Sequence, residues 1–440
     1  MINSKSLVKK QYDRVIYPDI PIEKSFKNEP NLLYIHSIIT ANYLRSQKVI
    51  DPQGSVILDV GCGSGYTSLL LAEANPGAKI IGVDISEPSV EMASKRLLHH
   101  HYTDAEFHAM DIQDLPNLRL SFDYINCNDT LYLLPDQISA LKSMQSVLSP
   151  QGIIRANLHN LFQRERFFRS QQLWQFLGLM DDVPNKIECD IVREIFESLQ
   201  DTITIKSQAW FSTNQEKRSS DEFVYVNHLL QGDCGFTTPQ MFEMLNASDL
   251  EFISMVNWKH WDLHNLFSDK QNIPPYFNAI LSSNSEELKH YAYELLNPIY
   301  RLLDFWCGHP GQSKSYTSPD SWDNAYWPNT KVFLNPYLKI DGIKLALDRA
   351  IANFTPFKIS DFFSRTTIAP IPLSTQSAIC LRMVWDRPIT VDELVKQWLR
   401  IKPLNILTLE PMTKAEAFTE IKQTLIEMEA HMFVMLESRC

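Results

Sequence analysis

The stretch Ile57-Leu-Asp-Val-Gly61-Cys-Gly63-Ser-Gly65 places three closely spaced glycines directly after a short apolar run. Glycine is scarce in this chain, 13 in 440 residues, yet six of the 13 fall between Gly54 and Gly82. Glycine lets a backbone turn sharply and lets a ligand approach without a Cβ in the way. The stretch therefore predicts a strand that ends in a ligand-binding loop, followed by a helix whose free amide groups can receive an anionic group.

Strand-like and helix-like runs alternate on both sides of this loop. SVILDV, KIIGVD, EFHAM, FDYINC and GIIRANLH are typical of strands, and TSLLLAEA and SVEMASKRLL are typical of helices. Right-handed crossovers would place these helices on both faces of the sheet. The alternation predicts an α/β fold with a doubly wound, Rossmann-like parallel sheet whose ligand lies at the carboxyl ends of the strands.

Aspartates follow three consecutive predicted strands: Asp59, Asp84 and Asp111. A carboxylate at Asp84 can accept both hydroxyls of a ribose, and Asp111 can reach an adenine amino group. Each aspartate alone could be an ordinary turn or cap residue. Their joint spacing with the glycines predicts a cofactor that contains adenosine. Tyr66 stands where the dinucleotide fingerprint GxGxxG needs its third glycine, which disfavours NAD.

With these motifs, residues 30–160 resemble the class I methyltransferases that depend on S-adenosylmethionine (SAM). The resemblance implies SAM as cofactor and S-adenosylhomocysteine as product. In that family the glycine loop passes under the methionine part of SAM, and Asp59 lies near its amino group. The opening YDRVIYP also resembles a bacterial subgroup with an appended regulatory-type domain. The cofactor-binding residues that the resemblance implies are Asp59, Gly61, Cys62, Gly63, Gly65, Asp84, Ile85, Asp111, Ile112 and Asn128.

The segment after the fourth strand, FDYINCNDTLYLL, supplies candidate catalytic residues. The resemblance places Asn128, Asp129 and Tyr132 near the sulfonium and the acceptor. Methyl transfer depends mainly on alignment and an uncharged nucleophile, so a dedicated base is not required. If a base acts, Asp129 and His159 are the best placed, because both follow predicted strands.

Two further features concern the acceptor and the closure of the predicted site. Tyr12 and Tyr17 are candidate lid residues that close over SAM. The fourth-strand loop departs from the NPPY motif of methyltransferases that modify amide or exocyclic amino nitrogens, which weakens an amide acceptor without excluding it.

The length predicts two or three packed units. A helix is expected over Asn31–Gln47, and another over the run EELKHYAYELLNPIYRLLDFW. The expected division is an N-terminal helical cap (1–50), the SAM-binding core (51–160), a helical insertion or substrate lid (161–235), a return to the core sheet (236–260), a helical region (261–335) and a C-terminal accessory domain, α/β or helical (336–440).

Composition limits the class of protein. Hydrophobic residues at 44% and charged residues at 21% predict a folded chain, and the net charge of -11 disfavours a nucleic-acid partner. Seven scattered cysteines without a CxxC pair predict reduced thiols and no bound metal. No apolar run is long enough to span a membrane and no cleavable leader is evident at the start, so a cytoplasmic protein is expected.

Two local clusters of basic side chains are better explained as solvent-exposed surface than as binding sites. His99, His100 and His101 point around a helix axis and cannot converge on one ion, which predicts a solvated surface. The basic run of Arg164, Arg166 and Arg169 is more typical of a solvated helix face than of a phosphate site. His228 is left open between a functional and a structural role.

The leading hypothesis is methyl transfer from SAM to an acceptor beneath the helical insertion. The large additions to the core favour a nitrogen on a protein side chain or a medium-sized metabolite over nucleic acid. The alternative is a SAM-binding regulatory or scaffold protein without turnover. The acceptor and the oligomeric state stay open at this point.

Overall fold

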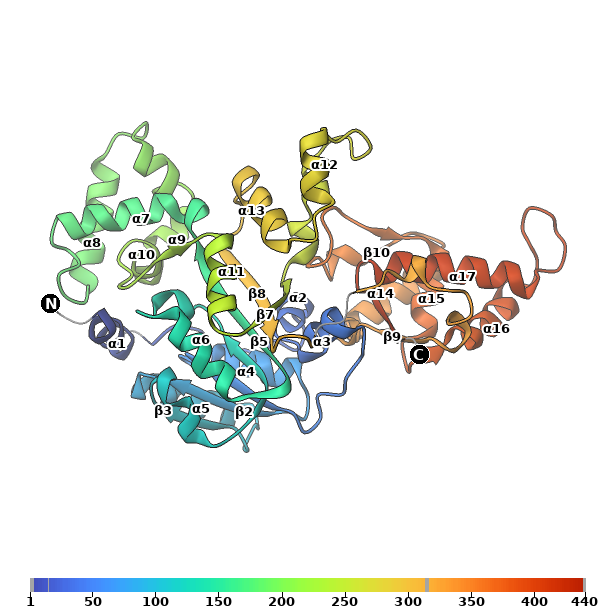
Figure 1. Ribbon diagram of the computed structural model, residues 1–440, viewed down its shortest axis with the longest axis horizontal. Coiled ribbons are helices and arrows are strands. Elements are labelled where there is room, and N and C mark those ends of the chain that lie inside the picture. Colours follow the sequence, from blue (N-terminus) through green and yellow to red (C-terminus); the bar gives the residue numbers. More distant parts are fainter. Residues whose placement is uncertain (1–3, 15, 313–315, 438–440) are drawn as a thin grey trace.

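The computed structural model describes residues 4–14, 16–312 and 316–437 (Figure 1). A central sheet has the strand order β3-β2-β1-β4-β5-β8-β7, with β6 (Gly235–Phe236) beside β5. The first five strands are parallel: β1 (Val56–Val60), β2 (Lys79–Asp84), β3 (Glu106–Ala109), β4 (Phe122–Cys127) and β5 (Leu148–Asn160). The Rossmann-like α/β prediction is confirmed.

Successive residues of the inner strands face opposite sides of the sheet. Ile57 and Ile80 pack into one hydrophobic core, while Leu58 and Ile81 pack into the other. Helices α4 (Tyr66–Ala74) and α5 (Glu87–His99) contribute to the first core, and α6 (Gln137–Ser146) and α11 (Thr238–Ala247) to the second. Because both faces are covered, the strands read as continuous apolar runs in the sequence.

The expected helix over 286–306 is wrong. Helix α13 (Glu286–Leu296) stops before Pro298, and β8 (Leu302–Gly308) then lies antiparallel between β5 and β7 (Glu251–Met255). Proline lacks the amide hydrogen that a helix needs and biases the residue before it toward an extended backbone. Region 261–335 is therefore not uniformly helical, whereas β7 does return to the sheet.

The expected helix over 31–47 is also interrupted. Helix α2 (Pro30–Ile35) ends at His36, and α3 (Ile38–Ser46) begins after Ser37, whose hydroxyl caps the Thr40 amide at 3.1 Å. Asn75 stabilises the break, because its side chain accepts from Ile38 N and donates to His36 O. A polar residue from α4's far end thus replaces the helical hydrogen bonds lost at the break.

The helical insertion forms a lobe over the carboxyl ends of the strands, drawn in green in Figure 1. Its own core holds Trp174, Phe196, Trp210 and the fully buried His228. Its helices are α7 (Leu161–Phe176), α8 (Lys186–Ser198), a π-helix (Lys206–Trp210), α9 (Gln215–Ser219) and α10 (Asp221–Asn227). The solvated-face prediction fails for Arg164, which is buried and paired with a carboxylate, and holds for the exposed Arg169.

The C-terminal region lies at the opposite end of the sheet from this lobe (Figure 1). Three antiparallel strands, β9 (Lys331–Leu334), β12 (Ile389–Thr390) and β13 (Val434–Glu437), pair in the order β12-β9-β13. The unit is α/β, and β9 begins before the predicted boundary at 336. The other α-helices and strands that follow β7 are α12 (Pro275–Leu281), α14 (Asp341–Ala352), β10 (Phe357–Lys358), β11 (Pro372–Leu373), α15 (Thr375–Met383), α16 (Val391–Ile401) and α17 (Lys414–Glu429).

Within the described ranges, no helix is both long and apolar enough to cross a bilayer. The same residues contain no group of three metal-ligating side chains. Six cysteines are free thiols; Cys440 lies outside the described residues.

Candidate active site

A cavity of about 490 Å³ opens at the carboxyl ends of β1 to β4. The loops after these strands form its wall, and α1 (Ser4–Arg14) with the segment after it contributes the other side. Sequence-predicted residues in the wall are Gly61, Cys62, Gly63, Asp84, Ile85, Asp111, Ile112, Asn128, Asp129, Tyr12 and Tyr17.

The glycine loop follows β1 in a left-handed backbone. Gly61, Gly63 and Gly65 have φ values of 72°, 48° and 77°, a region that side chains disfavour. A Cβ on Gly63 would lie 2.5 Å from the carbonyl oxygen of Tyr17, so only glycine fits there. Gly65 is the residue before α4 and does not line the cavity.

Asp84 ends β2 in the cavity wall. Its Oδ2 accepts the Gly63 amide and its Oδ1 accepts the Ser86 amide, both at 2.9 Å. Burial raises the pKa of this carboxyl, although the two amides oppose the shift. Each oxygen keeps a second lone pair, so the carboxylate can still accept two hydroxyl groups.

The loop after β3 forms one end of the cavity. Asp111 caps the 3-10 helix Ile112–Leu118 by accepting the Gln113 amide at 3.0 Å. Ile85 and Ile112 also line the cavity and add apolar surface to it.

Asp59 does not line the cavity, which corrects the prediction of a direct cofactor contact. The side chain is fully buried beneath the loop and accepts Ser68 Oγ at 2.6 Å and Asn126 Nδ2 at 2.8 Å. Burial raises its pKa to about 6, against the opposing effect of these two hydrogen bonds. Asp59 thus ties α4 and β4 to β1 and holds the loop from below.

Asp129 follows β4 with a left-handed backbone, φ 50°. Its amide donates to Asn157 Oδ1, and its Oδ1 accepts Arg301 Nη2, each at 2.9 Å. Tyr132 OH donates to the same oxygen at 3.2 Å, and Asn128 Nδ2 donates to Oδ2 at 3.2 Å. Burial would raise the pKa of this carboxyl, but Arg301, His159 and the hydrogen bonds lower it below the usual value. Asp129 therefore faces the cavity as a carboxylate.

Tyr132, predicted near the sulfonium and the acceptor, and His159, a candidate base, are both absent from the cavity wall and are buried beside Asp129. The two rings stack with centroids 3.6 Å apart. His159 Nε2 accepts Arg301 Nη1 at 2.9 Å, so Nδ1 carries the hydrogen that is donated to Asp233 at 2.6 Å. Burial lowers the pKa of His159 to about 4. Both nitrogens are engaged, so this imidazole is not free to act as a base.

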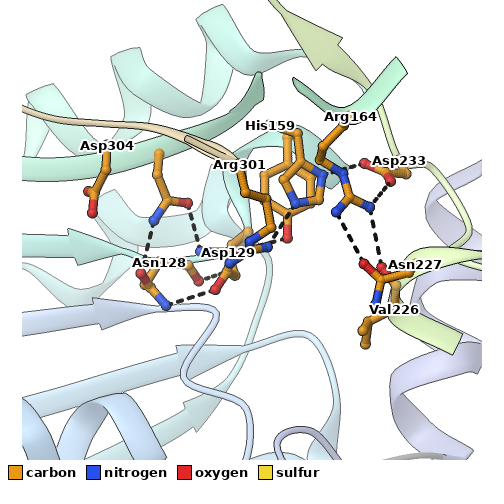
Figure 2. A network of polar contacts seen from close by, with 12 residues as sticks. Asn128, Asp129, His159, Arg164, Val226, Asn227, Asp233, Arg301 and Asp304 are labelled. Carbon is orange, nitrogen blue, oxygen red and sulfur yellow. Dashed lines mark hydrogen bonds and ion pairs between the residues drawn. The ribbon is translucent and has the colours of Figure 1, made fainter. Parts of the chain in front are cut away.

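Sequence reasoning missed Arg301, Asp233 and Glu222. Figure 2 shows Arg301 beside Asp129 and His159, with Asp233 and Arg164 on the far side of His159. Arg301 lies 172 residues from Asp129 in the sequence, inside a run that was expected to be helical. Glu222 reaches the cavity from α10 of the insertion. No local pattern marks any of the three.

The segment after α1 holds the glycine loop. Ser64 N donates to Tyr17 O at 3.0 Å, and Ser64 Oγ donates to Pro18 O at 2.8 Å. Lys9 Nζ donates to Ile85 O at 2.9 Å. Tyr12 and Tyr17 lie over the cavity, where burial raises the pKa of the Tyr17 hydroxyl to about 12. Their movement as a lid stays a prediction.

Comparison with known proteins agrees with this geometry. A family model described as "Methyltransferase domain" matches residues 51–224. These residues are a class I SAM-dependent methyltransferase domain. The match starts just before β1 and ends within α10, so the methyltransferase domain contains the glycine loop, Asp84, Asp111, Asp129 and Glu222.

Curated relatives match only parts of the chain. An uncharacterized protein of Synechococcus sp. is 25% identical over 257 residues, which cover 57% of this chain and 60% of the relative. The tRNA U34 carboxymethyltransferase of Campylobacter lari is 31% identical over 104 residues, 23% of this chain and 34% of the relative. The chain thus spans 60% or less of the length of these two relatives.

Among solved structures, PKMT2 from Rickettsia typhi has a TM-score of 0.60 and 16% identity over 95% of this chain and 76% of PKMT2. A second structure of that protein, in complex with AdoHcy, has a TM-score of 0.60 and 17% identity over 95% of this chain and 77% of that chain. At such low identity the likeness shows a shared fold, and the fold extends through the C-terminal region.

The described residues fit SAM, the cofactor of this domain class. Asp84 and Asp111 present acceptors for ribose hydroxyls and an amino group, and Ile85 with Ile112 provides apolar surface for a ring. Gly61 and Gly63 line the cavity, and side chains at these two positions would collide with Thr130 and with the Tyr17 carbonyl. These acceptor groups and apolar side chains match an adenosine group in chemistry.

Proposed function

We propose that this chain transfers a methyl group from SAM to a nitrogen nucleophile on a protein side chain or a medium-sized metabolite. The observation that carries the proposal is the cavity itself, which joins carboxylates suited to adenosine with a second, acidic and aromatic end. SAM supplies a methyl group on a sulfonium, which a nucleophile displaces in line, leaving S-adenosylhomocysteine. The chain's residues need only align the two partners and exclude water.

The acceptor end of the cavity favours nitrogen. Besides Asp84 and Asp111, the cavity is lined by the carboxylates of Asp129, Asp136 and Glu222 and by Tyr12 and Tyr17. Among the described residues that line the cavity there is no lysine or arginine. Carboxylates accept N–H hydrogen bonds and attract cationic molecules, whereas they repel phosphates. An amine is thus favoured over nucleic acid, in agreement with the net charge of -11.

Asp129 is the residue proposed to orient the acceptor. Among the described residues, its Oδ2 accepts a hydrogen bond only from the Asn128 side-chain Nδ2, at 3.2 Å, which leaves a lone pair for an N–H of the acceptor. A nitrogen that donates its N–H to Asp129 has its own lone pair pointing away from the carboxylate. In the proposed complex that lone pair points toward the methyl group of SAM. A bond from nitrogen to the methyl carbon forms as the carbon–sulfur bond breaks, and the methylated ammonium later loses a proton to water.

Calorimetric titration with SAM, S-adenosylhomocysteine and NAD tests the cofactor first. Binding of the first two alone is expected; binding of NAD, or of none, would reject the proposal. A peptide array with a central Lys, Arg, His, Gln or Ser, together with a panel of small amines, is then incubated with the protein and [methyl-³H]SAM. Label on nitrogen-containing acceptors, with one S-adenosylhomocysteine formed per methyl group, is expected. SAM binding without any transfer would favour a regulatory or scaffold protein.

A further inference from the structure

Arg301 joins Asp129, the residue proposed to orient the acceptor, to the buried His159. Its Nη2 donates to Asp129 Oδ1 and its Nη1 donates to His159 Nε2, both at 2.9 Å. Figure 2 shows the guanidinium lying between these two groups. The planar fork of arginine can make both contacts at once, which a single ammonium group cannot.

The far side of this bridge is held rigidly. His159 donates from Nδ1 to the fully buried carboxylate of Asp233, which also accepts Arg164 Nη2 at 3.1 Å and Gln171 Nε2 at 2.9 Å. The Arg301 carbonyl accepts the amide of Asn160 at 2.8 Å, so the backbone is fixed as well. The bridge therefore extends from the cavity wall into the core of the insertion.

Asp129 itself has a backbone that needs support. A left-handed conformation at a residue other than glycine costs free energy and persists only where its surroundings impose it. The Asn157 side chain holds the amide of Asp129, and Arg301 holds its carboxylate. Such strain is found where a side chain must point in one direction, here along the cavity wall.

We propose that Arg301 is a positioning residue for methyl transfer: it holds the Asp129 carboxylate at the acceptor side of the cavity and offsets its negative charge. The inference rests on the proposed amine acceptor. An isolated carboxylate would stabilise an amine as its ammonium form, which has no lone pair to attack the methyl group. A carboxylate paired with Arg301 still accepts an N–H hydrogen bond, but it stabilises the ammonium form less.

The same pairing keeps Asp129 ionised. Without Arg301 the burial of this carboxyl is less well opposed, so its pKa is expected to rise. The titratable and charged groups that face Asp129 from the surrounding elements are Tyr12, Tyr17, Cys127, Tyr132, Arg155, His159 and Arg301. Arg155 is already paired with Asp304 at 2.8 Å, which leaves Arg301 as the cation bound to Asp129.

The test follows Asp129 by NMR in protein labelled with ¹³C at the aspartate carboxyl groups, with Asp129→Asn used to assign its signal. The variants are Arg301→Gln and Arg301→Lys, and the control is Arg169→Gln, an arginine of similar exposure on α7. In the parent, the control and Arg301→Lys, the signal is expected to stay that of a carboxylate from about pH 8 to about pH 5. In Arg301→Gln it is expected to titrate within that range. An unchanged signal in Arg301→Gln would overturn the proposal.

Activity separates positioning from simple structural damage. With the amine acceptor that labels most strongly, Arg301→Gln is expected to lower kcat at pH 7 by at least about tenfold and to move the acidic limb of the pH profile upward by about one unit. Arg301→Lys should return the acidic limb of the pH profile to its position in the parent, because lysine keeps the positive charge. It should not restore kcat, because one ammonium group cannot replace the two N–H donors that bridge Asp129 and His159. A rate lowered equally at every pH would contradict the proposal. If the parent fails to bind SAM, the proposed function fails while the NMR titration still decides the role of Arg301.

Discussion

The Asp84 carboxylate accepts the Gly63 amide at 2.9 Å, so the group proposed to hold the ribose also fixes the loop proposed to hold the methionine. Its other oxygen accepts the Ser86 amide before α5. One side chain therefore couples the ends of two strands. The loss of this carboxylate removes both a ligand contact and a loop anchor.

Asp84→Ala is expected to weaken SAM binding by more than about tenfold, roughly 1.4 kcal/mol or more. The ribose hydroxyls lose a charged acceptor and the Gly63 amide loses its partner. Calorimetry measures the affinity directly. The exposed Asp104→Ala serves as the control and should bind SAM as the parent does; equal affinity in both variants would remove Asp84 from the site.

Gly63→Ala is expected to disturb the contact between the loop and the segment after α1. Its Cβ would meet the Tyr17 carbonyl at 2.5 Å, and alanine is strained at φ 48°. The expected cost is about 1–3 kcal/mol in the free energy of unfolding, together with weaker SAM binding. Gly342→Ala in α14 has open space around its Cβ and should be neutral or stabilising. Urea unfolding of both variants decides, and a Gly63→Ala protein as stable as the control would contradict the strain argument.

Asp233→Asn is expected to lower the free energy of unfolding by about 3–5 kcal/mol, because Arg164 would stay buried without its carboxylate. Asparagine keeps one carbonyl oxygen, which can still accept the His159 Nδ1 hydrogen, but its NH2 group would face the donors Arg164 and Gln171. Asp190→Asn on the exposed face of α8 removes ion pairs to Lys186 and Arg193 and should leave the free energy of unfolding close to that of the parent, because solvent screens these pairs. Denaturant midpoints measured side by side test the difference, and equal losses would mean that burial does not set the cost.

The pH dependence of stability should report His228, a buried residue of the insertion core. Burial lowers its pKa to about 3 from the ordinary value of 6.5. A lowered pKa means that the unfolded chain binds the extra proton first, so this contribution to stability is complete above pH 6.5 and is lost as the pH falls. Below pH 6.5 the loss is up to about 1.4 kcal/mol per pH unit for this one group.

Relative to the parent, His228→Phe is therefore expected to gain about 2 kcal/mol in the free energy of unfolding between pH 7.5 and pH 5. Phenylalanine fits among Phe167, Phe196 and Trp210, but it loses the 2.8 Å hydrogen bond between His228 Nδ1 and the buried Ser170 Oγ, so near pH 7.5 the variant is expected to be less stable than the parent by about 1 kcal/mol. Urea unfolding at both pH values is the measurement. Parallel pH profiles for the two proteins would show that His228 is not the group that titrates.

Several site residues could be predicted because their positions follow from local pattern. A strand that ends in glycines, and an aspartate at the end of the next strand, meet at one edge whenever parallel strands lie side by side. Gly61, Gly63, Asp84, Asp111 and Asp129 accordingly lie in the cavity wall. The same reasoning misplaced Asp59, because a residue inside a strand points into the core as readily as toward the ligand.

The errors concern contacts between distant segments. The run 286–306 was expected to be one helix from its apolar spacing, whereas Pro298 ends the helix and the sheet recruits the following residues as β8. That pairing aligns Leu302 with His159 and so brings Arg301 to Asp129. Arg164 was expected on a solvated face, but the lobe folds Asp233 against it.

The amino-acid sequence by itself determined the α/β core, the glycine loop and the carboxylates for the cofactor, because strand periodicity, turns and strand ends are written in neighbouring residues. Only the tertiary structure decided what surrounds Asp129. The charge and direction of that carboxylate depend on Arg301, 172 residues away, and on His159 and Asp233 behind it. Electrostatic interactions of this kind depend on distance in space and on burial, and neither can be obtained from spacing along the chain.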